Sequence, residues 1–194
     1  MIIRPRLLFA VLWIAWLVSW IAAAVWASRP EKRLLTVETL IYRVAILAGA
    51  VLLSPWAARG LDMRQLWHVS FDGAYARAGL TAAGLLFTWW ARIHLGRLWS
   101  GTITAKEGHR VVDTGPYAWV RHPIYTGLIL ALFASAVAQA TISGLAGAAL
   151  VSFGFWLKAR MEERFLAAEL GAGAYDAYRR RVPMLLPLPR SGRK

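Results

Sequence analysis

The sequence predicts an all-α integral membrane protein with about five transmembrane helices. The last two are expected to form a helical hairpin, which a cytosolic C-terminal helix follows. Of the 194 residues, 58% are hydrophobic, and the mean hydropathy of +0.47 is too high for an ordinary soluble domain. The apolar residues form blocks of about 20, the length that a helix needs to cross a hydrocarbon core about 30 Å thick. Burial in lipid is therefore expected to determine the fold.

The composition excludes several classes of site. The chain has no cysteine, so disulfides, thiolate nucleophiles and cysteine-ligated metals are ruled out. The four histidines show no metal-binding spacing, and no metal is expected. The net charge of +13 comes mostly from residues in loops that flank apolar blocks. That placement indicates contact with anionic lipid headgroups and predicts no nucleic-acid partner.

The first span is expected at Leu7–Ala27, which carries no charge. The alternative is a cleaved signal peptide, because Arg4 and Arg6 resemble its basic region and Ala22–Ala24 resembles a cleavage site. The apolar core of a signal peptide usually has about 7 to 15 residues. The longer block here favours a retained helix.

The second span, about Leu34–Ala57, contains Glu38 and Arg43. These side chains either face a cavity or a partner inside the bundle, or reach to the interface near the start of the helix. The third span, about Ala74–Ile93, offers Gly79 and Gly84 for close helix contact.

Residues Ile124–Leu157 are expected to form the hairpin, with a turn within Ala138–Gly144. At 1.5 Å per residue, arms of about 16 to 18 residues reach about 24 to 27 Å. The tip of the hairpin is therefore expected just inside the far interface.

The basic residues predict the orientation. Three lie in residues 28–36, five in residues 92–123 and nine after Leu157. The remaining flanking segments carry five: Arg4, Arg6, Arg59, Arg64 and Arg77. Because lysine and arginine favour the cytoplasmic side, the 92–123 loop and the tail are expected in the cytosol and the N-terminus outside. In a prokaryote this would be the cytoplasmic membrane.

The triplet Arg121-His122-Pro123 stands at the start of the hairpin. Proline fixes its own φ and keeps the preceding residue out of helical geometry, so a helix is expected to begin at Pro123. The first amides of a helix lack partners and attract anions. Arg121 and His122 could hold a carboxylate or phosphate there, with Tyr117 and Trp119 covering a planar ring. The alternative is that both are headgroup anchors.

The segment "WLKARMEERFLAAEL" follows the hairpin and is expected to be helical. One face would carry Trp156, Ala159, Glu163, Leu166 and Leu170. A carboxylate on an apolar face needs a partner, either ligand hydroxyls, a ligand amine, or an arginine such as Arg160 or Arg121. Glu162 is interpreted as a surface pair with Lys158 at the i, i+4 spacing.

The tail carries Tyr175 and Tyr178 and the basic run Arg179–Arg181. The run is expected to lie against anionic lipid. Pro183 and Pro187 end helical structure, leaving Met184–Leu188 as an apolar patch.

Four segments, in order, closely resemble the isoprenylcysteine carboxyl methyltransferase family of integral membrane enzymes. They are "RIHLGRLWS", "KEGHRVVDTGPYAWVRHPIYTG", "MEERFLAAELG" and "YDAYRRRVPMLLP". Together they cover about residues 92–187 of a single domain, 1–194, whose residues 1–91 supply the N-terminal spans. The combination of Arg-His-Pro-x-Tyr-x-Gly with a later Glu-Glu is specific. One departure is "GAGAY", which has an additional residue if Gly171 is the family's glycine.

The resemblance implies a cytosolic C-terminal region that binds S-adenosylmethionine, with a lipophilic substrate entering from the bilayer. The residues that it assigns to the cofactor are Tyr117, His122, Pro123, Tyr125, Gly127, Glu162 and Glu163. It makes Arg121 the active-site arginine near the acceptor, and Glu163 is the other residue expected to act in catalysis. The implied reaction is methyl transfer to a lipophilic acceptor, in the first instance the carboxyl group of a prenylcysteine-like or other lipid acid.

Other functions also fit the sequence. The same cofactor could serve a phospholipid amine, a lipophilic thiol or a phenol. An NADPH-dependent membrane reductase of the sterol type has a similar C-terminal region, and Arg179–Arg181 would suit its phosphates. A non-catalytic membrane scaffold is the third possibility. Membrane lipids and the lipophilic substrate are the expected partners, and no obligate protein partner is evident.

Overall fold

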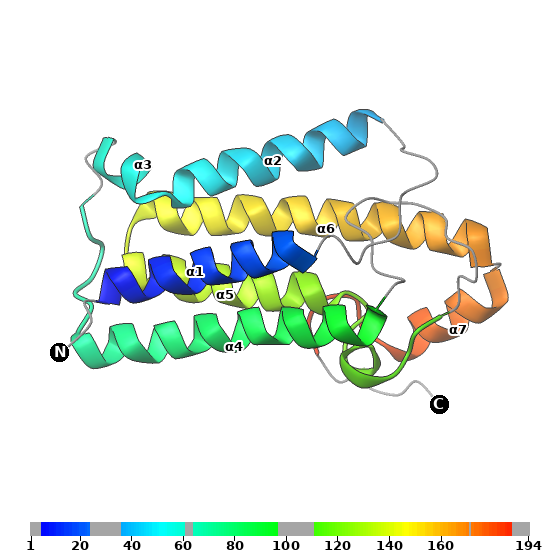
Figure 1. Ribbon diagram of the computed structural model, residues 1–194. Helices are drawn as coiled ribbons and strands as arrows, with labels where there is room; N and C mark the ends of the chain where they lie inside the picture. The colour runs from blue at the N-terminus through cyan, green and yellow to red at the C-terminus, as the bar shows by residue number, and fades with distance from the viewer. Residues whose placement is uncertain (1–4, 24–35, 61–63, 97–110, 171, 188–194) are drawn as a thin grey trace.

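The computed structural model describes residues 5–23, 36–60, 64–96, 111–170 and 172–187, and within these ranges it contains helices and no strand. The elements are α1 (Pro5–Ala22), α2 (Val37–Leu53), α3 (Pro55–Gly60), α4 (Phe71–Leu95), the 3-10 helix η3 (Gly115–Ala118), α5 (Pro123–Gln139), α6 (Ile142–Leu170) and α7 (Ala172–Arg181). The long helices lie side by side, and α7 crosses them at one end (Figure 1). The all-helical prediction is confirmed for the described residues.

Several expectations fall outside these ranges. They concern the end of the first span, the start of the second, most of the 28–36 loop, residues 97–110 of the long loop, and Gly171 and Leu188. In the part of the chain that the structure describes, two helices could cross a membrane by length and composition alone, α1 and the Ile142–Ala168 part of α6, and α5 is a shorter apolar helix. Five crossings stay a prediction.

The helix boundaries follow from local sequence. Thr36 and Ser70 cap α2 and α4 by accepting hydrogen bonds from backbone amides three residues later. The prediction that the second span continues to Ala57 is wrong, because α2 ends at Leu53. Pro55 cannot donate a backbone hydrogen bond and keeps Ser54 extended, so the chain breaks there and restarts as α3.

The hairpin is confirmed. Ala140 adopts a left-handed conformation with φ of 57°, and Thr141 then caps α6 by accepting a hydrogen bond from the Gly144 amide. The second arm is much longer than the sequence predicts, because α6 continues without a break through Glu163 to Leu170. Residues 155–170 contain neither proline nor glycine, so nothing in the sequence ends the helix earlier.

Glycines allow two close helix contacts. A Cβ at Gly84 would lie 2.5 Å from the Gly127 carbonyl oxygen, so α4 and α5 approach through backbone. A Cβ at Gly49 would lie 2.7 Å from the Gly147 carbonyl oxygen, between α2 and α6. The expectation for Gly84 is confirmed and that for Gly79 is wrong, because Gly79 has nothing within 4 Å.

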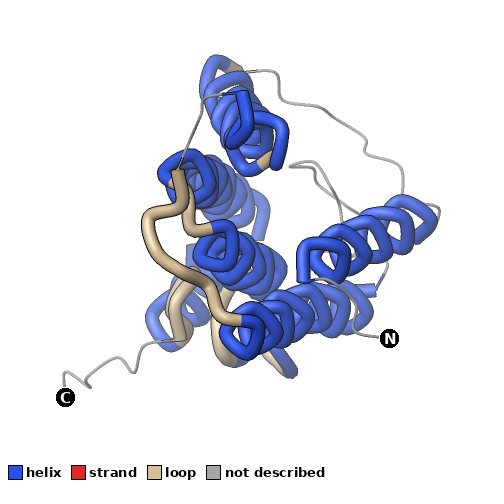
Figure 2. Tube along the Cα trace, turned by 90° about the vertical axis from the view of Figure 1, so that its left-hand side faces the viewer, coloured by secondary structure: helices blue, strands red, loops and turns tan. Residues whose placement is uncertain are grey.

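The outer face of α1 is apolar, as a lipid-facing surface requires, with Leu7, Ile14 and Val18 more than half exposed. The indole Nε1 atoms of Trp13 and Trp16 instead donate to Ser135 on α5 and Thr88 on α4. Figure 2 views the bundle along its length, and the helix farthest to the right in it is α1, which packs on α4. Pairing each polar tip inside the bundle removes the cost of burying it.

Different segments of the chain meet at the two ends of the helical bundle. The turn between α5 and α6 lies near Leu53 and Leu66, since Gln139 donates to the Leu53 carbonyl and the Leu66 amide donates to the Ala140 carbonyl. At the opposite end, the start of α2 meets the later part of α6 through the ion pair of Glu38 with Arg164, both more than half exposed. Glu38 therefore has a partner, whereas Arg43 is exposed. The orientation of these two ends in a membrane stays a prediction.

Candidate functional site

The candidate site lies where α5 begins, at the end of the bundle that α7 covers. Pro123 occupies the first position of α5 and His122 is its N-cap, with φ of −125° and ψ of 63°. The predicted helix start is confirmed. The preceding turn depends on Gly115, whose φ is +57° and where a Cβ would lie 2.7 Å from the His94 ring. His94 in turn contacts the Thr114 hydroxyl at 2.9 Å, which ties the end of α4 to this turn.

Glu163 of α6 is the anion at this helix start. Its Oε1 accepts a hydrogen bond of 2.7 Å from Arg121 Nε and lies 2.7 Å from Arg121 Nη2. The same oxygen is 3.2 Å from His122 Nε2. The side chains of Arg121, His122 and Glu163 are 5%, 8% and 9% exposed, so this is a desolvated ion pair. Of the two arginines proposed as its partner, Arg121 is the one that binds, whereas Arg160 stacks on Trp156.

Glu162 faces the same cluster from the next position on α6. Its Oε1 accepts a hydrogen bond of 2.7 Å from the Tyr125 hydroxyl, and its Oε2 lies 3.5 Å from His122 Nδ1. The predicted pair with Lys158 exists at 3.8 Å, but the side chains are only 13% and 19% exposed. The interpretation as a surface pair is therefore wrong, because α5 covers this face of α6.

Aromatic rings form a stack beside the two carboxylates. The His122 and Tyr125 rings are nearly parallel with centroids 5.5 Å apart, and Phe155 continues the stack 5.1 Å from Tyr125. Tyr117 is buried nearby under the His94 ring, 6.3 Å away. The exposed Trp119 does not join this stack but contacts Phe87 and Trp90 of α4.

The C-terminal tail closes the site through its backbone. Arg121 Nη1 donates to the carbonyls of Arg179 and Val182, the first at 3.0 Å. The amides of Arg121 and His122 donate to the Pro183 and Met184 carbonyls at 2.9 and 3.1 Å. The Arg121-His122 segment is therefore held between α6 and the tail.

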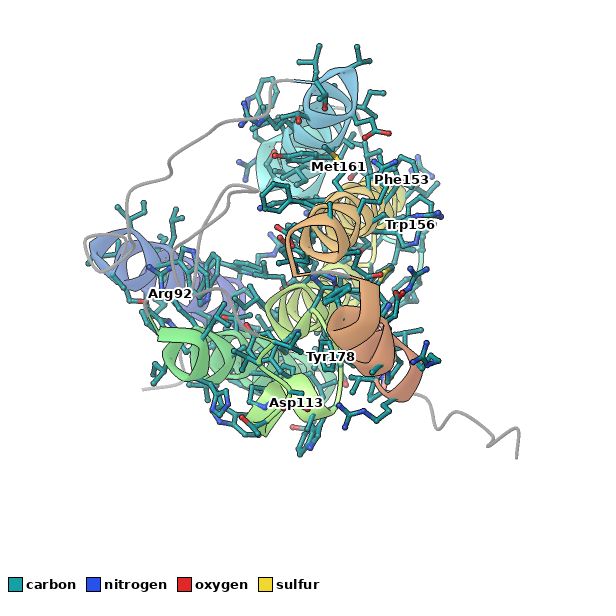
Figure 3. All side chains as sticks on the ribbon, turned by 90° about the vertical axis from the view of Figure 1, so that its right-hand side faces the viewer. Arg92, Asp113, Phe153, Trp156, Met161 and Tyr178 are labelled. Carbon is teal, nitrogen blue, oxygen red and sulfur yellow. The ribbon has the colours of Figure 1, made fainter. Side chains whose placement is uncertain are left out.

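The inner face of α7 anchors that tail. Tyr175 and Tyr178 are buried, and the Tyr178 hydroxyl donates to the Tyr117 carbonyl at 2.8 Å. On the outer face, Arg181 pairs with Asp113 at 3.0 Å. Figure 3, which faces this end, shows Tyr178 of α7 with Asp113 nearby, and Met161 of α6 near α2.

Burial and the two glutamates shift the pKa of His122 in opposite directions. Burial alone would lower the pKa of His122, but the hydrogen bonds to Glu162 and Glu163 and their charges raise it above its usual value. In the protonated ring, Nε2 donates to Glu163 and the Nδ1 proton faces Glu162 at 3.5 Å. Burial raises the pKa of Tyr117, and Tyr178 and Glu162 add to the effect. The Tyr117 phenol is therefore neutral at physiological pH.

Most of the residues predicted to bind the cofactor therefore lie close together. Glu162, Glu163, His122 and Tyr125 are in direct contact, and Pro123 sets the helix start. Gly127 instead lies against α4, where a Cβ would be 2.8 Å from the Thr88 Cγ2 atom. Its part in binding a cofactor stays a prediction.

Two components are not recognisable from the motifs. One is Lys158, whose Nζ lies 5.4 Å from the Tyr125 ring centroid and 5.9 Å from that of Tyr42 on α2. Its position four residues before Glu162 is the available signal. The other is the set of tail carbonyls, for which a sequence carries no side-chain signal. Within the described ranges, no three histidine or acidic side chains are grouped as a metal ion would need.

Comparisons with known proteins cover this part of the chain. Residues 78–168 match the model of the isoprenylcysteine carboxyl methyltransferase (ICMT) family. The match includes the Arg-His-Pro motif and both glutamates and ends before α7.

Curated relatives differ in name. The chain is 46% identical over 72 residues to methanethiol S-methyltransferase 2 of Bradyrhizobium diazoefficiens, which is 37% of this chain and 26% of that protein. It is 29% identical over 104 residues to protein-S-isoprenylcysteine O-methyltransferase of Schizosaccharomyces pombe, 50% of this chain and 42% of that protein. It is 31% identical over 125 residues to the cobalt-zinc-cadmium resistance protein CzcN of Cupriavidus metallidurans, 62% of this chain and 55% of that protein.

The chain spans about half the length of the curated relatives that it matches over the longest stretches. Two of the three relatives described above are methyltransferases by name. The resemblance to the isoprenylcysteine carboxyl methyltransferase family, predicted from the motifs, is confirmed for residues 78–168.

Proposed function

We propose that the protein is an S-adenosylmethionine-dependent methyltransferase of the membrane that acts on a lipophilic acceptor. The first candidate reaction is carboxyl O-methylation of a prenylcysteine-like or other lipid acid. The observation that carries this proposal is the buried cluster of Arg121, His122, Glu162 and Glu163 at the covered end of an apolar helical bundle. The site would face the cytosol, with the acceptor arriving from the bilayer.

The donor set fits this cofactor. Its ribose hydroxyls, ammonium and sulfonium all favour carboxylate partners, and its adenine ring favours an aromatic surface. Glu163 Oε1 is engaged by Arg121 and His122, whereas its Oε2 lies 3.9 Å from Arg179 Nε, beyond hydrogen-bonding distance. Oε2 is therefore the atom that we expect to accept a ligand hydroxyl or ammonium.

When bound, the cofactor would supply a methyl group activated by a positively charged sulfur. The chain's residues then have mainly to align the reactants and exclude water. Glu162 and Glu163 bind the donor, and His122 holds both carboxylates in place through its two ring nitrogens. Arg121 fixes Glu163 and keeps one Nη2 hydrogen that could point toward the acceptor. A carboxylate acceptor is already ionised at neutral pH, so it needs no general base.

A thiol acceptor is the second candidate. It is favoured by the matches to methanethiol S-methyltransferases, which have higher identity over shorter stretches than the isoprenylcysteine enzyme. A free thiol with a pKa of about 8.5 has to lose its proton before it attacks. A kcat/KM that rises with pH toward that value would indicate the thiol, and a pH-independent kcat/KM near neutrality would indicate the carboxylate.

Ligand binding tests the proposal directly. In detergent-purified protein, S-adenosylhomocysteine at about one hundred times its Kd should stabilise the fold by about 2.7 kcal/mol. For a chain of this size, that raises Tm by about 5 to 11 °C. NADPH should not raise it. Glu162→Gln should lose most of the S-adenosylhomocysteine shift, while the exposed control Glu38→Gln should keep it.

The alternatives predict different results. Stabilisation by NADPH instead would indicate a sterol-type reductase. Stabilisation by neither ligand would contradict an enzyme of either class and favour a scaffold.

A further inference from the structure

Exposed aromatic side chains gather at the end of the bundle that holds the candidate site. Trp119, two residues before Arg121, is 58% exposed, and Trp90 of α4 is 42% exposed. The ring centroid of Trp119 lies 5.5 Å from that of Trp90 and 6.1 Å from that of Phe87. We call Phe87, Trp90 and Trp119 the site-end belt. An exposed apolar cluster of this kind marks a surface that contacts a protein partner or a membrane.

A second group of exposed aromatic side chains lies at the opposite end of the bundle. Trp56 of α3 is 72% exposed, and Phe71, the first residue of α4, is 67% exposed. Figure 1 shows α3 and the start of α4 at the same end as the turn between α5 and α6. We call Trp56 and Phe71 the turn-end belt. Exposed aromatic rings therefore mark both ends of the described bundle.

The distance between the two belts matches the thickness of a hydrocarbon core. Phe71 and Trp90 are 19 residues apart on α4, which at about 1.5 Å per residue corresponds to about 28 Å. Helix α5 joins the same two ends with 17 residues, or about 25 Å. The hydrocarbon core of a bilayer is about 30 Å thick, and tryptophan is enriched at both of its surfaces. The spacing therefore favours a membrane over a protein partner.

The polarity of the exposed surface changes at the belts. Beyond the site-end belt, Arg179 and Arg181 are 57% and 65% exposed, as contact with anionic headgroups requires. Arg77, between the belts, is partly buried, and its guanidinium lies against Gly73 near the turn-end belt, in the manner of an arginine that reaches for the interface. The exposed positions of α4 from residue 76 to residue 90 are uncharged: Ala76, Gly79, Leu80, Ala83, Leu86 and Trp90.

We propose that the site-end belt binds the headgroup boundary of a lipid bilayer and holds the cluster of Arg121 and Glu163 at that depth, with the turn-end belt at the opposite boundary. Two residues of chain reach at most about 7.6 Å between Cα atoms, so the backbone of Arg121 lies within that distance of Trp119. The candidate site is therefore at the edge of the hydrocarbon core, where lipid and water meet. This depth does not depend on the reaction that the site performs.

The depth of each belt can be measured with single nitroxide labels, because the chain has no cysteine of its own. Leu80→Cys reports a position midway between the belts on α4. Ile93→Cys, at a position that is 67% exposed, reports the site-end belt without removing an aromatic ring, and Trp119→Cys reports the belt itself. Each labelled protein is placed in nanodiscs of phosphatidylcholine and phosphatidylglycerol. Electron paramagnetic resonance then compares the accessibility of the label to oxygen, which concentrates in hydrocarbon, with its accessibility to a water-soluble nickel chelate.

We expect the Leu80 label near the centre of the bilayer. The Ile93 label should be about 18 to 20 Å shallower, because 13 residues of helix separate the two positions. The Trp119 label should lie at the depth of the Ile93 label to within about one helical turn, about 5.4 Å. Leu80 and Ile93 are exposed, so these two variants keep the fold even if Trp119→Cys does not.

A second comparison tests whether the indole rings set this depth. Trp90 and Trp119 are both replaced by leucine in the Ile93→Cys protein. Leucine prefers hydrocarbon, whereas tryptophan prefers the interface, so the Ile93 label should move deeper. The matched control is Phe153→Leu, which removes a 47% exposed aromatic ring of α6 that belongs to neither belt. It should leave the depth of the Ile93 label unchanged.

Several results would overturn this proposal. An Ile93 label that the nickel chelate reaches as freely as it reaches a label in water would place the site-end belt outside the membrane. An Ile93 label as deep as the Leu80 label would place the belt inside the hydrocarbon core. Shielding of the Ile93 label from both reagents, with spin–spin broadening that disappears on dilution with unlabelled protein, would show that a second copy of the chain covers the belt. An unchanged depth after both leucine replacements would mean that the indole rings do not anchor this end.

Discussion

Replacing Glu163 by glutamine should destabilise the protein far more than removing an exposed ion pair. The change leaves the Arg121 guanidinium, whose side chain is 5% exposed, without its counter-charge. Removing one partner of a buried pair costs about 3 to 5 kcal/mol. The lower value of about 3 kcal/mol applies here, because the amide oxygen can still accept one hydrogen bond. For a chain of this size, about 3 kcal/mol lowers Tm by about 6 to 12 °C.

The matched control is Glu38→Gln, which breaks the pair of Glu38 with Arg164, whose side chains are 52% and 64% exposed. Exposed pairs contribute about 0 to 1 kcal/mol, so Tm should fall by at most about 4 °C. Both variants are unfolded thermally in the same detergent at pH 7. Equal shifts for the two variants would refute the reasoning, because they would mean that Arg121 and Glu163 are not desolvated as the structure places them.

Two further predictions concern ionisation and packing. The raised pKa of His122 contributes stability that is fully present below the unfolded pKa of about 6.5 and is lost as pH rises through the folded pKa. Tm should therefore fall as pH increases from 6 to 9, and His122→Gln should flatten this slope. An unchanged slope in the variant would contradict the raised pKa of His122. Gly84→Ala should destabilise by about 1 to 3 kcal/mol, because its Cβ would meet the Gly127 carbonyl. Gly79→Ala, with open space around it, should be neutral or stabilise by about 0.5 to 1 kcal/mol. A denaturation series of both variants that gave the same sign would contradict the close contact of α4 with α5.

Features set by neighbouring residues can be predicted from the sequence. Proline at the first helical position fixes the start of α5 wherever the helix is placed, and a carboxylate on an apolar face requires a polar or charged partner. The sequence therefore indicates that Glu163 needs a partner, with Arg121 among the candidates. The structure selects Arg121 and adds His122 on the same oxygen.

Features set by distant segments cannot be predicted in this way. A lysine and a glutamate four residues apart usually indicate a solvated helix face, and the spacing of Lys158 and Glu162 predicts such a face here. Only the packing of α5 against α6 shows that this face is covered, and only the position of Tyr42 shows that α2 borders it. The predicted second arm of the hairpin is too short, because the apolar residues end well before helix α6 does.

The backbone carbonyls of residues 179–185 that hold Arg121, His122 and Thr126 also bear on biosynthesis. A ribosome makes the helix start and both glutamates before it makes these carbonyls. Until those residues are made, the carboxylate of Glu163 is the partner that the guanidinium of Arg121 can bind. A stop codon placed before Val182 would leave every acidic and aromatic component of the cluster in the chain but remove four of the five tail carbonyls that hold it.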